Sequence, residues 1–338
     1  MASFRKTLVP VLLMVCCFGL AATADAPKLD SPGYAFIANQ YEHTALLVDL
    51  RTNAPVARVE VGVNGHEVAV DPEGHFGYVP IYGNSGVGKP GTDGDRVDII
   101  DLAERKLAGS IPLGKPVRPH CAKFGPGGFL YVTAELAEAI YVVDVQAKKV
   151  VGEIPTGAIE SHMFVISPDG KRAYTSNVHA GSVSVLDLEK RSLITVIPIS
   201  KIVQRISMTA DGKRVFTHDQ DQPRIAVIDT RTNKVSGWIS VPSSIYSSAP
   251  LPGGHTMVAY SPAGKLFSID LDTLKQIGES DACASLGELA LTSDANRVFL
   301  TCPATGQLLT YNPHNGKPDR EIMLTKGVDG IQWLPAVK

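Results

Sequence analysis

Three histidines at matching positions along the chain are the first candidates for chemistry. His66, His120 and His162 each stand at the entry to a short apolar segment, and the same place recurs in every repeat of the sequence. Neutral imidazoles are common ligands of zinc and copper, with metal–nitrogen distances of about 2.0 to 2.1 Å for zinc. If the fold brings these side chains together, they predict a metal site with an open coordination position.

The three histidines belong to a column of seven equivalent positions, obtained by aligning the repeats. Its members are His66, His120, His162, Gln204, Tyr246, Gly287 and Asp329. Further charged residues lie within two positions of the column, and they are Glu67, Arg118, Glu160, Arg205 and Glu288. A concave site with this many titratable groups suits a metal or a small anionic ligand. We therefore expect these residues, with Gln204, Tyr246 and Asp329, to bind ligand.

A repeating unit must position this column. An acidic residue ends a short apolar segment in six copies, at Asp49, Asp101, Asp144, Asp187, Asp229 and Asp270, with Asn312 as the seventh. Successive copies are 52, 43, 43, 42, 41 and 42 residues apart. Such a regular period, filled with short strands and turns, is typical of a β-propeller.

Each unit predicts four strands in the same order, most clearly in residues 161–197. A Ser-Pro-Asp-Gly turn at 167–170 separates the first two strands, and related turns stand at 71–74 and 209–212. Proline favours the φ angle that a turn needs and glycine accepts a positive one, so these are hairpin corners. The strands are rich in β-branched and aromatic residues, as expected between neighbouring blades.

The repeats also resemble a known family. The run SPDGKRAYTSNVHAGSVSVLDLEKRSLITVIPI, with DLRTN at 49–53 and DTRTN at 229–233, is similar to the YVTN-type repeat of bacterial seven-bladed propellers. The resemblance spans about residues 34–335. It implies the propeller fold, but family members include surface, periplasmic and binding proteins, and related rings include lactonases, so it leaves function open.

The two ends of the repeat region predict how the ring closes. The region begins with the second strand of a unit, at 34–39, and finishes with an isolated first strand, at 330–335. Pairing these segments would complete the last blade and remove exposed sheet edges. We expect an all-β fold: a seven-bladed β-propeller of four-stranded antiparallel blades, closed by its C-terminal strand, forming one domain over residues 25–338.

The first 24 residues have the pattern of an export signal. Arg5 and Lys6 precede an apolar run at 8–20 and an Ala-Thr-Ala cleavage site at 22–24. A membrane anchor is the alternative, although the run is short for a span. Removal of the two basic residues changes the net charge from −2 to −4. We expect a periplasmic or secreted monomer with no membrane span, and this charge argues against nucleic acid as partner.

Three cysteines follow the predicted cleavage site. They are Cys121, Cys283 and Cys302, so at least one stays unpaired in an oxidising compartment. Cys283 and Cys302 fall in the same blade and could pair. The expected position of Cys302 opposite about Gly287 argues against that pairing.

A long insertion falls on the same face as the histidine column. Residues 81–96 replace a loop of about five residues, and the Gly-rich segment 83–90 only superficially imitates a phosphate-binding loop, because Pro90 replaces the required hydroxyl. The insertion is either a lid or an inert loop. Strand direction also places His43, His179 and His218 in loops of this face, and His75, His255 and His314 in turns of the other.

Three functional hypotheses follow. The first is an exported propeller that binds zinc, copper or a small molecule at the channel mouth. The second is a lactonase-like hydrolase or isomerase acting on a small anionic substrate, with histidine as acid or base and Arg118 or Arg205 on a carboxylate. The third is a scaffold for a periplasmic protein partner. No catalytic motif is recognised, so the sequence favours binding over turnover.

Overall fold

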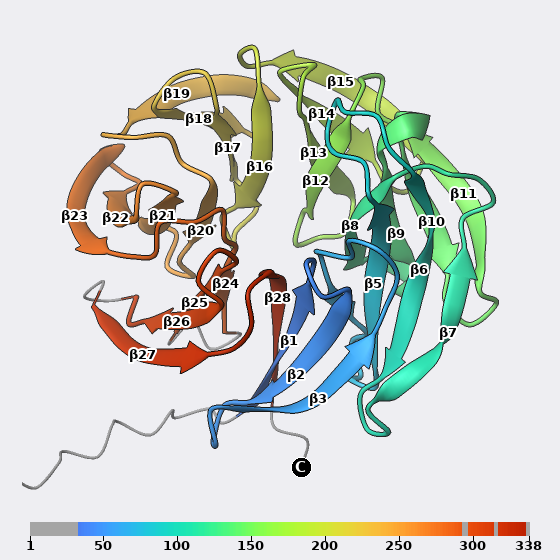
Figure 1. Cartoon of the computed structure of the whole chain (residues 1–338). Helices are drawn as coiled ribbons and strands as arrows, with labels where there is room; N and C mark the ends of the chain where they lie inside the picture. The colour runs from blue at the N-terminus through green and yellow to red at the C-terminus, as the bar shows by residue number, and fades with distance from the viewer. Residues whose placement is uncertain (1–32, 293–296, 314–316, 336–338) are drawn as a thin grey trace, which may run out of the picture.

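Seven four-stranded antiparallel sheets form a closed ring (Figure 1), as the repeats predicted. This computed structural model describes residues 33–292, 297–313 and 317–335. Besides strands, these residues form two short 3-10 turns, η1 (Pro126–Gly128) and η2 (Glu135–Ala137). The expected signal peptide and His314 lie outside the described residues. None of the described residues forms a helix long and apolar enough to cross a membrane.

The strands of each blade follow one another in the sequence, except that β28 completes the first blade. The first four blades comprise β28 (Val328–Pro335), β1 (Gly33–Asn39), β2 (Thr44–Asp49) and β3 (Ala54–Glu60); β4 (Ala69–Val70), β5 (Phe76–Gly83), β6 (Asp93–Asp101) and β7 (Lys106–Pro112); β8 (Pro119–Phe124), β9 (Leu130–Ala134), β10 (Ala139–Asp144) and β11 (Lys149–Pro155); and β12 (Ser161–Ile166), β13 (Arg172–Asn177), β14 (Ser182–Asp187) and β15 (Ser192–Pro198). The other three comprise β16 (Val203–Met208), β17 (Arg214–Asp219), β18 (Arg224–Asp229) and β19 (Lys234–Ser240); β20 (Ser247–Pro250), β21 (Thr256–Ser261), β22 (Lys265–Asp270) and β23 (Lys275–Asp281); and β24 (Leu289–Leu291), β25 (Val298–Cys302), β26 (Gln307–Tyr311) and β27 (Pro318–Met323).

The recurring aspartates end the third strand of their blades and build the turn that follows. The Oδ1 atom of Asp101 accepts hydrogen bonds from the backbone N–H groups of Ala103 (3.0 Å) and Glu104 (2.8 Å). Asp229 accepts two equivalent bonds, from Arg231 and Thr232. A short acidic side chain that satisfies two turn amides explains why this residue type repeats.

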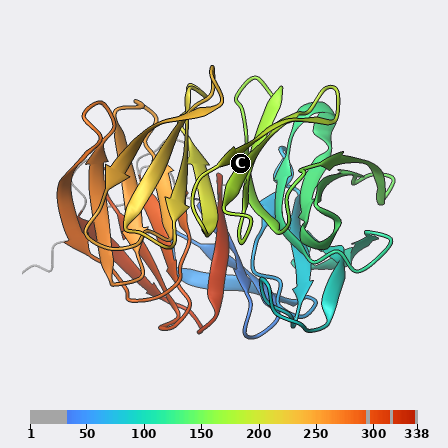
Figure 2. The same cartoon turned by 90° about the horizontal axis from the view of Figure 1, so that it is seen from above.

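Every blade also bends at the same place. The register between the third and fourth strands shifts two residues before the recurring acidic position, for example between Val185 and Leu186 and between Val227 and Ile228. A β-bulge adds local twist to a strand pair. The outermost strand of each blade is therefore twisted relative to the third strand. Figure 2 shows the same blades seen from above.

The hydrophobic core lies between neighbouring blades. Tyr174 and Tyr260 are fully buried there, and their hydroxyl groups still find partners. The Tyr174 hydroxyl donates to Asn233 Oδ1 of the next blade (3.2 Å), and the Tyr260 hydroxyl donates to the carbonyl groups of Cys283 and Ser285 (both 2.7 Å). Large aromatic rings thus fill the space between sheets while their polar ends connect the blades.

The ring closes as the sequence predicted, through antiparallel pairing of β28 with β1. Their register runs from Gly33 opposite Pro335 to Asn39 opposite Val328, with one irregularity after Ile37. β28 is the innermost strand of this closing blade, and β3 is the outermost (Figure 1). Beside it, the Asn39 amide donates to Thr325 Oγ1 (2.9 Å) and to the Lys326 carbonyl (3.0 Å).

The argument against pairing of Cys283 with Cys302 is wrong. The two cysteines form a disulfide with Cα atoms 6.2 Å apart. Cys302 ends β25, and the segment between β23 and β24 turns back beside it because the Tyr260 hydroxyl bonds to its carbonyl groups. Cys121 stays free and buried, so the expectation of an unpaired cysteine holds among the described residues.

Removing β28 tests whether closure stabilises the whole ring. Truncation after Gly327 takes away the inner strand of the closing blade, so cooperative unfolding should be lost in all blades. Thermal melts followed by circular dichroism, with hydrogen exchange resolved by peptide, would measure this. Deletion of residues 336–338 alone serves as the control. If amide hydrogens of the fourth and fifth blades exchanged as slowly in the truncated chain as in the intact protein, the prediction would be contradicted.

Reduction of the disulfide should lower the free energy of unfolding by about 3 kcal/mol, because a loop of 19 residues is released in the unfolded chain. The Cys302→Ser variant should show the same loss in urea denaturation, and it should no longer respond to reductant. Cys121→Ala leaves the disulfide in place and controls for thiol loss. An unfolding midpoint of the parent chain that is insensitive to reductant would contradict this expectation.

Candidate functional site

The structure brings the three histidines of the predicted column together at one end of the central channel. His120 and His162 lie at the start of the inner strands β8 and β12, and His66 lies in the segment just before β4. The His66 and His120 Nε2 atoms are 2.6 Å apart, and the His120 and His162 rings stack with centroids 3.6 Å apart. We call these three residues the histidine cluster.

Hydrogen bonds to the outer ring nitrogens orient two of the imidazoles. The Nδ1 atom of His162 is 2.5 Å from Glu135 Oε1, and that of His66 is 3.2 Å from both the Asn64 carbonyl and Asn64 Oδ1. These acceptors hold the proton of each imidazole on Nδ1. The Nε2 atom is then unprotonated, and its lone pair can bind a metal. Such carboxylate and carbonyl partners behind an imidazole are typical of metal-binding histidines.

His120 has no such partner. Its Nδ1 atom is buried and makes no hydrogen bond in the described structure. Because His66 already carries its proton on Nδ1, the close Nε2 contact requires His120 to donate from Nε2. The Nε2 atom of His162 in turn is 3.5 Å from the Gln204 side-chain nitrogen, consistent with acceptance of a weak hydrogen bond. One lone pair of the cluster, on His120 Nδ1, therefore has no hydrogen-bond donor among the described residues.

Burial keeps two of these imidazoles neutral. Removal from solvent lowers the pKa of His66 to about 3, with further lowering from the nearby His162 and Arg205. Burial likewise lowers the pKa of His120 well below its usual value, helped by the neighbouring histidines and by Arg205. Neutral imidazole is the form that binds metal.

Two residues of this site escaped the sequence analysis. Glu135, in η2, and Tyr82, in β5, are almost fully buried beside the histidine cluster, and the Tyr82 hydroxyl donates to Glu135 Oε2 (2.8 Å). The Tyr82 ring also packs edge-on against His120, with centroids 5.3 Å apart. Neither residue recurs in the other repeats, so alignment of the repeats carries no signal for them.

A second group of predicted residues meets across the channel next to the cluster. Arg205, almost fully buried in β16, places Nη1 3.1 Å from Glu67 Oε1 and 3.3 Å from Glu288 Oε1, while its Nη2 is 3.9 Å from Asp329 Oδ1. Its guanidinium carbon also lies 4.8 Å from the centre of the Tyr246 ring. One cation therefore faces three carboxylates, and we call these four charged residues the arginine layer.

Burial dominates the titration of the arginine layer. It raises the pKa of Asp329 to about 7 and that of Glu67 well above its usual value, against the opposing attraction of Arg205. The carboxylate of Glu288 contributes a further rise to both. The carboxyl groups outnumber the positive charge that stabilises them, so the layer is short of cations.

Two expected ligand-binding residues have other partners. Arg118 pairs with Asp93 (2.8 Å) and donates to the carbonyl groups of Gly86 (2.9 Å) and Lys89 (3.3 Å), so it holds the insertion. Glu160 faces the half-exposed His179, whose Nδ1 is 2.5 Å away. Neither of these two side chains forms a hydrogen bond with the histidine cluster.

The insertion reaches over the three blades that carry the histidine cluster. It leaves the second blade after Gly83, is held by Arg118 of the third, and approaches the fourth at Gly88. A methyl group built on Gly88 would lie 3.0 Å from the His179 ring and 3.3 Å from Glu160. Ser85 donates to Asp93 (2.6 Å) and ties the base of the loop together. This path fits the lid hypothesis.

His218 is placed differently from the sequence prediction. It lies inside strand β17 rather than in a loop, fully buried, with Nδ1 3.1 Å from the Tyr246 carbonyl and Nε2 2.8 Å from Ser248 Oγ. β17 continues to Asp219, so the turn before β18 begins only after His218. His43 and His179 do lie in turns between second and third strands, as predicted.

The histidine cluster can bind a metal cation through the lone pairs of its imidazole nitrogens. Two Nε2 atoms already face each other, although 2.6 Å is shorter than the roughly 3.4 Å that two ligands of a tetrahedral zinc ion require. Among the residues with described placement, no group of three or more His, Cys, Asp or Glu side chains is arranged to hold a metal ion. A metal would therefore have to separate the His66 and His120 rings slightly.

Comparisons with known proteins support the fold. No protein-family model matches the chain, and no curated protein matches it. Among solved structures, hydrazine synthase from Kuenenia stuttgartiensis is similar, with a TM-score of 0.70 and 21% identity over 86% of this chain and 98% of that one. At this identity the likeness shows a shared propeller architecture and carries no information about activity.

Buried His218 should make the protein sensitive to acid. Its pKa is lowered to about 3 by burial, whereas an unfolded histidine binds a proton near 6.5. As the pH falls below 6.5, this histidine binds a proton in the unfolded state but stays neutral in the folded state. His218 alone should therefore lower the free energy of unfolding by about 1.4 kcal/mol per pH unit, in addition to the effect of His66 and His120.

Urea denaturation at neutral and mildly acidic pH, with a chelator present, would measure this slope. His218→Gln should make it shallower by about one proton. His75→Gln, at an exposed position of the opposite face, is the matched control and should leave the slope unchanged. Equal slopes for the parent and His218→Gln would show that the buried imidazole is not responsible.

Proposed function

We propose that the protein binds a divalent transition metal, zinc or copper, through the Nε2 atoms of His66, His120 and His162. The observation that carries this proposal is the orientation of the imidazoles: acceptors behind His66 and His162 hold their protons on Nδ1, so each Nε2 carries a lone pair. His120 would join them as a ligand once its proton moves from Nε2 to the unpartnered Nδ1. In the part of the chain that the structure describes, the only donors to the first two lone pairs are the His120 N–H group and, at 3.5 Å, the Gln204 amide. A metal cation would replace both at neutral imidazoles.

The donor set favours zinc or copper over a hard cation. Imidazole nitrogen is a ligand of intermediate softness, whereas calcium and magnesium require oxygen. Glu135 would act from behind His162, raising its basicity through the Nδ1 hydrogen bond. Three nitrogen ligands would leave one position for water or a small anion, beside Gln204 and beneath the insertion at residues 84–92.

We further infer that this propeller works outside the cytoplasm and that its repeats are of the YVTN type. The basic, apolar and Ala-Thr-Ala pattern of residues 1–24 supports export, and the repeat motifs quoted above support the family. An intramolecular disulfide is consistent with an oxidising compartment. In this setting the insertion would act as a lid that selects what reaches the metal.

Metal analysis of the chain purified without an affinity tag tests the proposal. We expect about one zinc or copper per chain, and loss of it in the His120→Ala variant. His179→Ala removes a half-exposed imidazole from the same face and should keep the metal. Glu135→Gln keeps the three ligands and should weaken affinity by about 10- to 100-fold.

Two results would overturn the metal proposal. One is absence of bound metal after equilibration with zinc and with copper, while circular dichroism shows a folded chain. The other is unchanged metal content in His120→Ala. Because His120→Ala could also disturb packing against Tyr82, the Glu135→Gln affinity provides an independent reading.

A further inference from the structure

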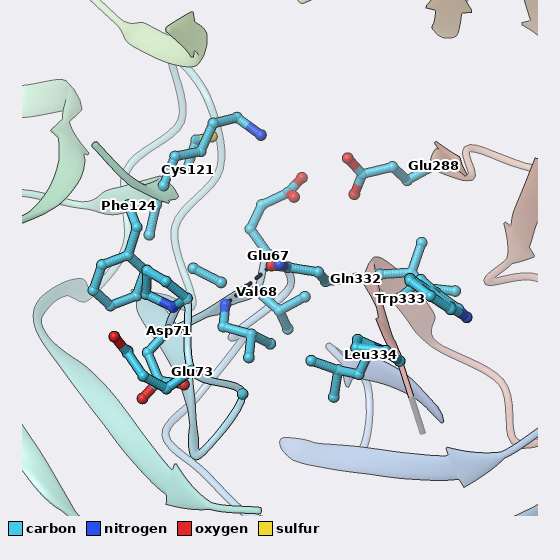
Figure 3. A pocket seen from close by; sticks show the side chains of 18 residues that line it. Glu67, Val68, Asp71, Glu73, Cys121, Phe124, Glu288, Gln332, Trp333 and Leu334 are labelled. Atoms are coloured by element: carbon cyan, nitrogen blue, oxygen red, sulfur yellow. Dashed lines mark hydrogen bonds between the residues drawn. The ribbon is translucent and has the colours of Figure 1, made fainter. Parts of the chain in front are cut away.

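A cavity of about 510 Å³ lies on the other side of the arginine layer from the histidine cluster. Its walls come from residues 67–74 around β4, 121–124 of β8, Glu288 before β24 and 331–335 of β28 (Figure 3). These residues follow His66 and His120 along the inner strands, so the cavity occupies the opposite end of the channel. Its volume is within the range of small-molecule sites.

Unpartnered carboxylate atoms line the inner part of the cavity. Glu67, about 95% buried, and Glu288 direct their carboxyl groups into it, as the close view shows (Figure 3). Glu67 Oε1 and Glu288 Oε2 are buried and form no hydrogen bond within the described structure. Arg205 is near both carboxyl groups, but its Nη1 is not aligned to donate to Glu67. These oxygens lie near positive charge but lack an aligned donor, so an N–H group of a ligand can still bond to them.

The charge of the cavity wall favours a cation. Glu67, Glu288, Asp71 and Glu73 line it, against Lys123 as the one basic residue among its described lining residues. Asp71 already accepts hydrogen bonds from backbone amides of its own turn, and Glu73 is exposed to solvent. Glu67 and Glu288 therefore remain as the inner carboxylates, which share the one guanidinium of Arg205. Buried carboxylates without enough positive charge are costly, and a cationic ligand would relieve this.

The remaining wall is apolar and aromatic. Phe124 of β8 lines one side of the cavity, and Trp333 and Leu334 of β28 line the other (Figure 3). An aromatic ring attracts an organic cation through its electron-rich face, and hydrocarbon gains by leaving water. A bare metal ion would need several more oxygen ligands and would leave most of this volume unfilled.

We propose that this cavity binds a small organic ammonium ion, with its charged nitrogen beside the carboxyl groups of Glu67 and Glu288 on the cavity side of Arg205, and its hydrocarbon part against the apolar wall that includes Trp333. The site is separate from the histidine cluster and does not depend on the metal. Lys123 lowers the affinity for such a ligand, because its charge repels the ammonium group. Loss of the Glu288 carboxylate should therefore weaken ammonium binding, whereas loss of the Lys123 charge should strengthen it.

Calorimetric titration of the full chain with butylammonium, phenethylammonium and choline, in the presence of a chelator, tests the proposal. We expect saturable one-site binding of at least one of them at or below millimolar concentration. Glu288→Gln should weaken it by tenfold or more. Glu189→Gln removes an exposed acid from a turn outside the cavity and should have no effect. Trp333 fluorescence in a Trp238→Phe background gives a second readout at the cavity wall.

Lys123→Met distinguishes the ligand class. It should tighten ammonium binding several-fold, which holds even if Glu288→Gln fails to fold. Absence of binding by all three ammonium ions would overturn the proposal. So would preferential binding of acetate that is lost in Lys123→Met, or binding of calcium in their place. His120→Ala should retain ammonium binding, which keeps this test independent of the metal site.

Discussion

The pairing of β28 with β1 is the contact on which the rest of the structure depends. Each of the seven blades buries its apolar faces only against its neighbours, so an open arc would expose the faces of its two terminal blades. The antiparallel register from Gly33 opposite Pro335 joins chain segments almost 300 residues apart and removes both exposed faces. It also places Asp329 and the wall residues of β28 beside the channel, where the functional side chains lie.

Closure explains the unusual chemistry of the channel. Seven inner strands surround a narrow space in which side chains from different blades meet and are buried. Burial there lowers the pKa of His66 and His120 and raises those of Glu67 and Asp329. Burial in the closed channel thus gives neutral imidazole nitrogens at one end and, next to them, carboxylates with too little positive charge around them. The first environment suits a metal ion and the second an organic cation.

The sequence predicted what is local and repeated, and it missed what occurs once. The recurring aspartates predicted where strands end, because each one builds the turn that follows it. The column of histidines was found by aligning the repeats. Glu135 and Tyr82 meet His162 and His120 through contacts between different blades, which no period records. Cys283 lies on a connecting segment held by the Tyr260 hydroxyl, so a register argument based on β25 alone could not place it.

The contacts of Arg205 also bear on how such a protein can change during evolution. This side chain extends from the fifth blade to acids of the second, the seventh and the closing blade, on the far side of the channel. Tandem repeats are readily duplicated or deleted, yet gain or loss of one unit would rotate these acids away from the guanidinium. The number of blades is therefore fixed by charge at the centre of the ring as well as by strand twist.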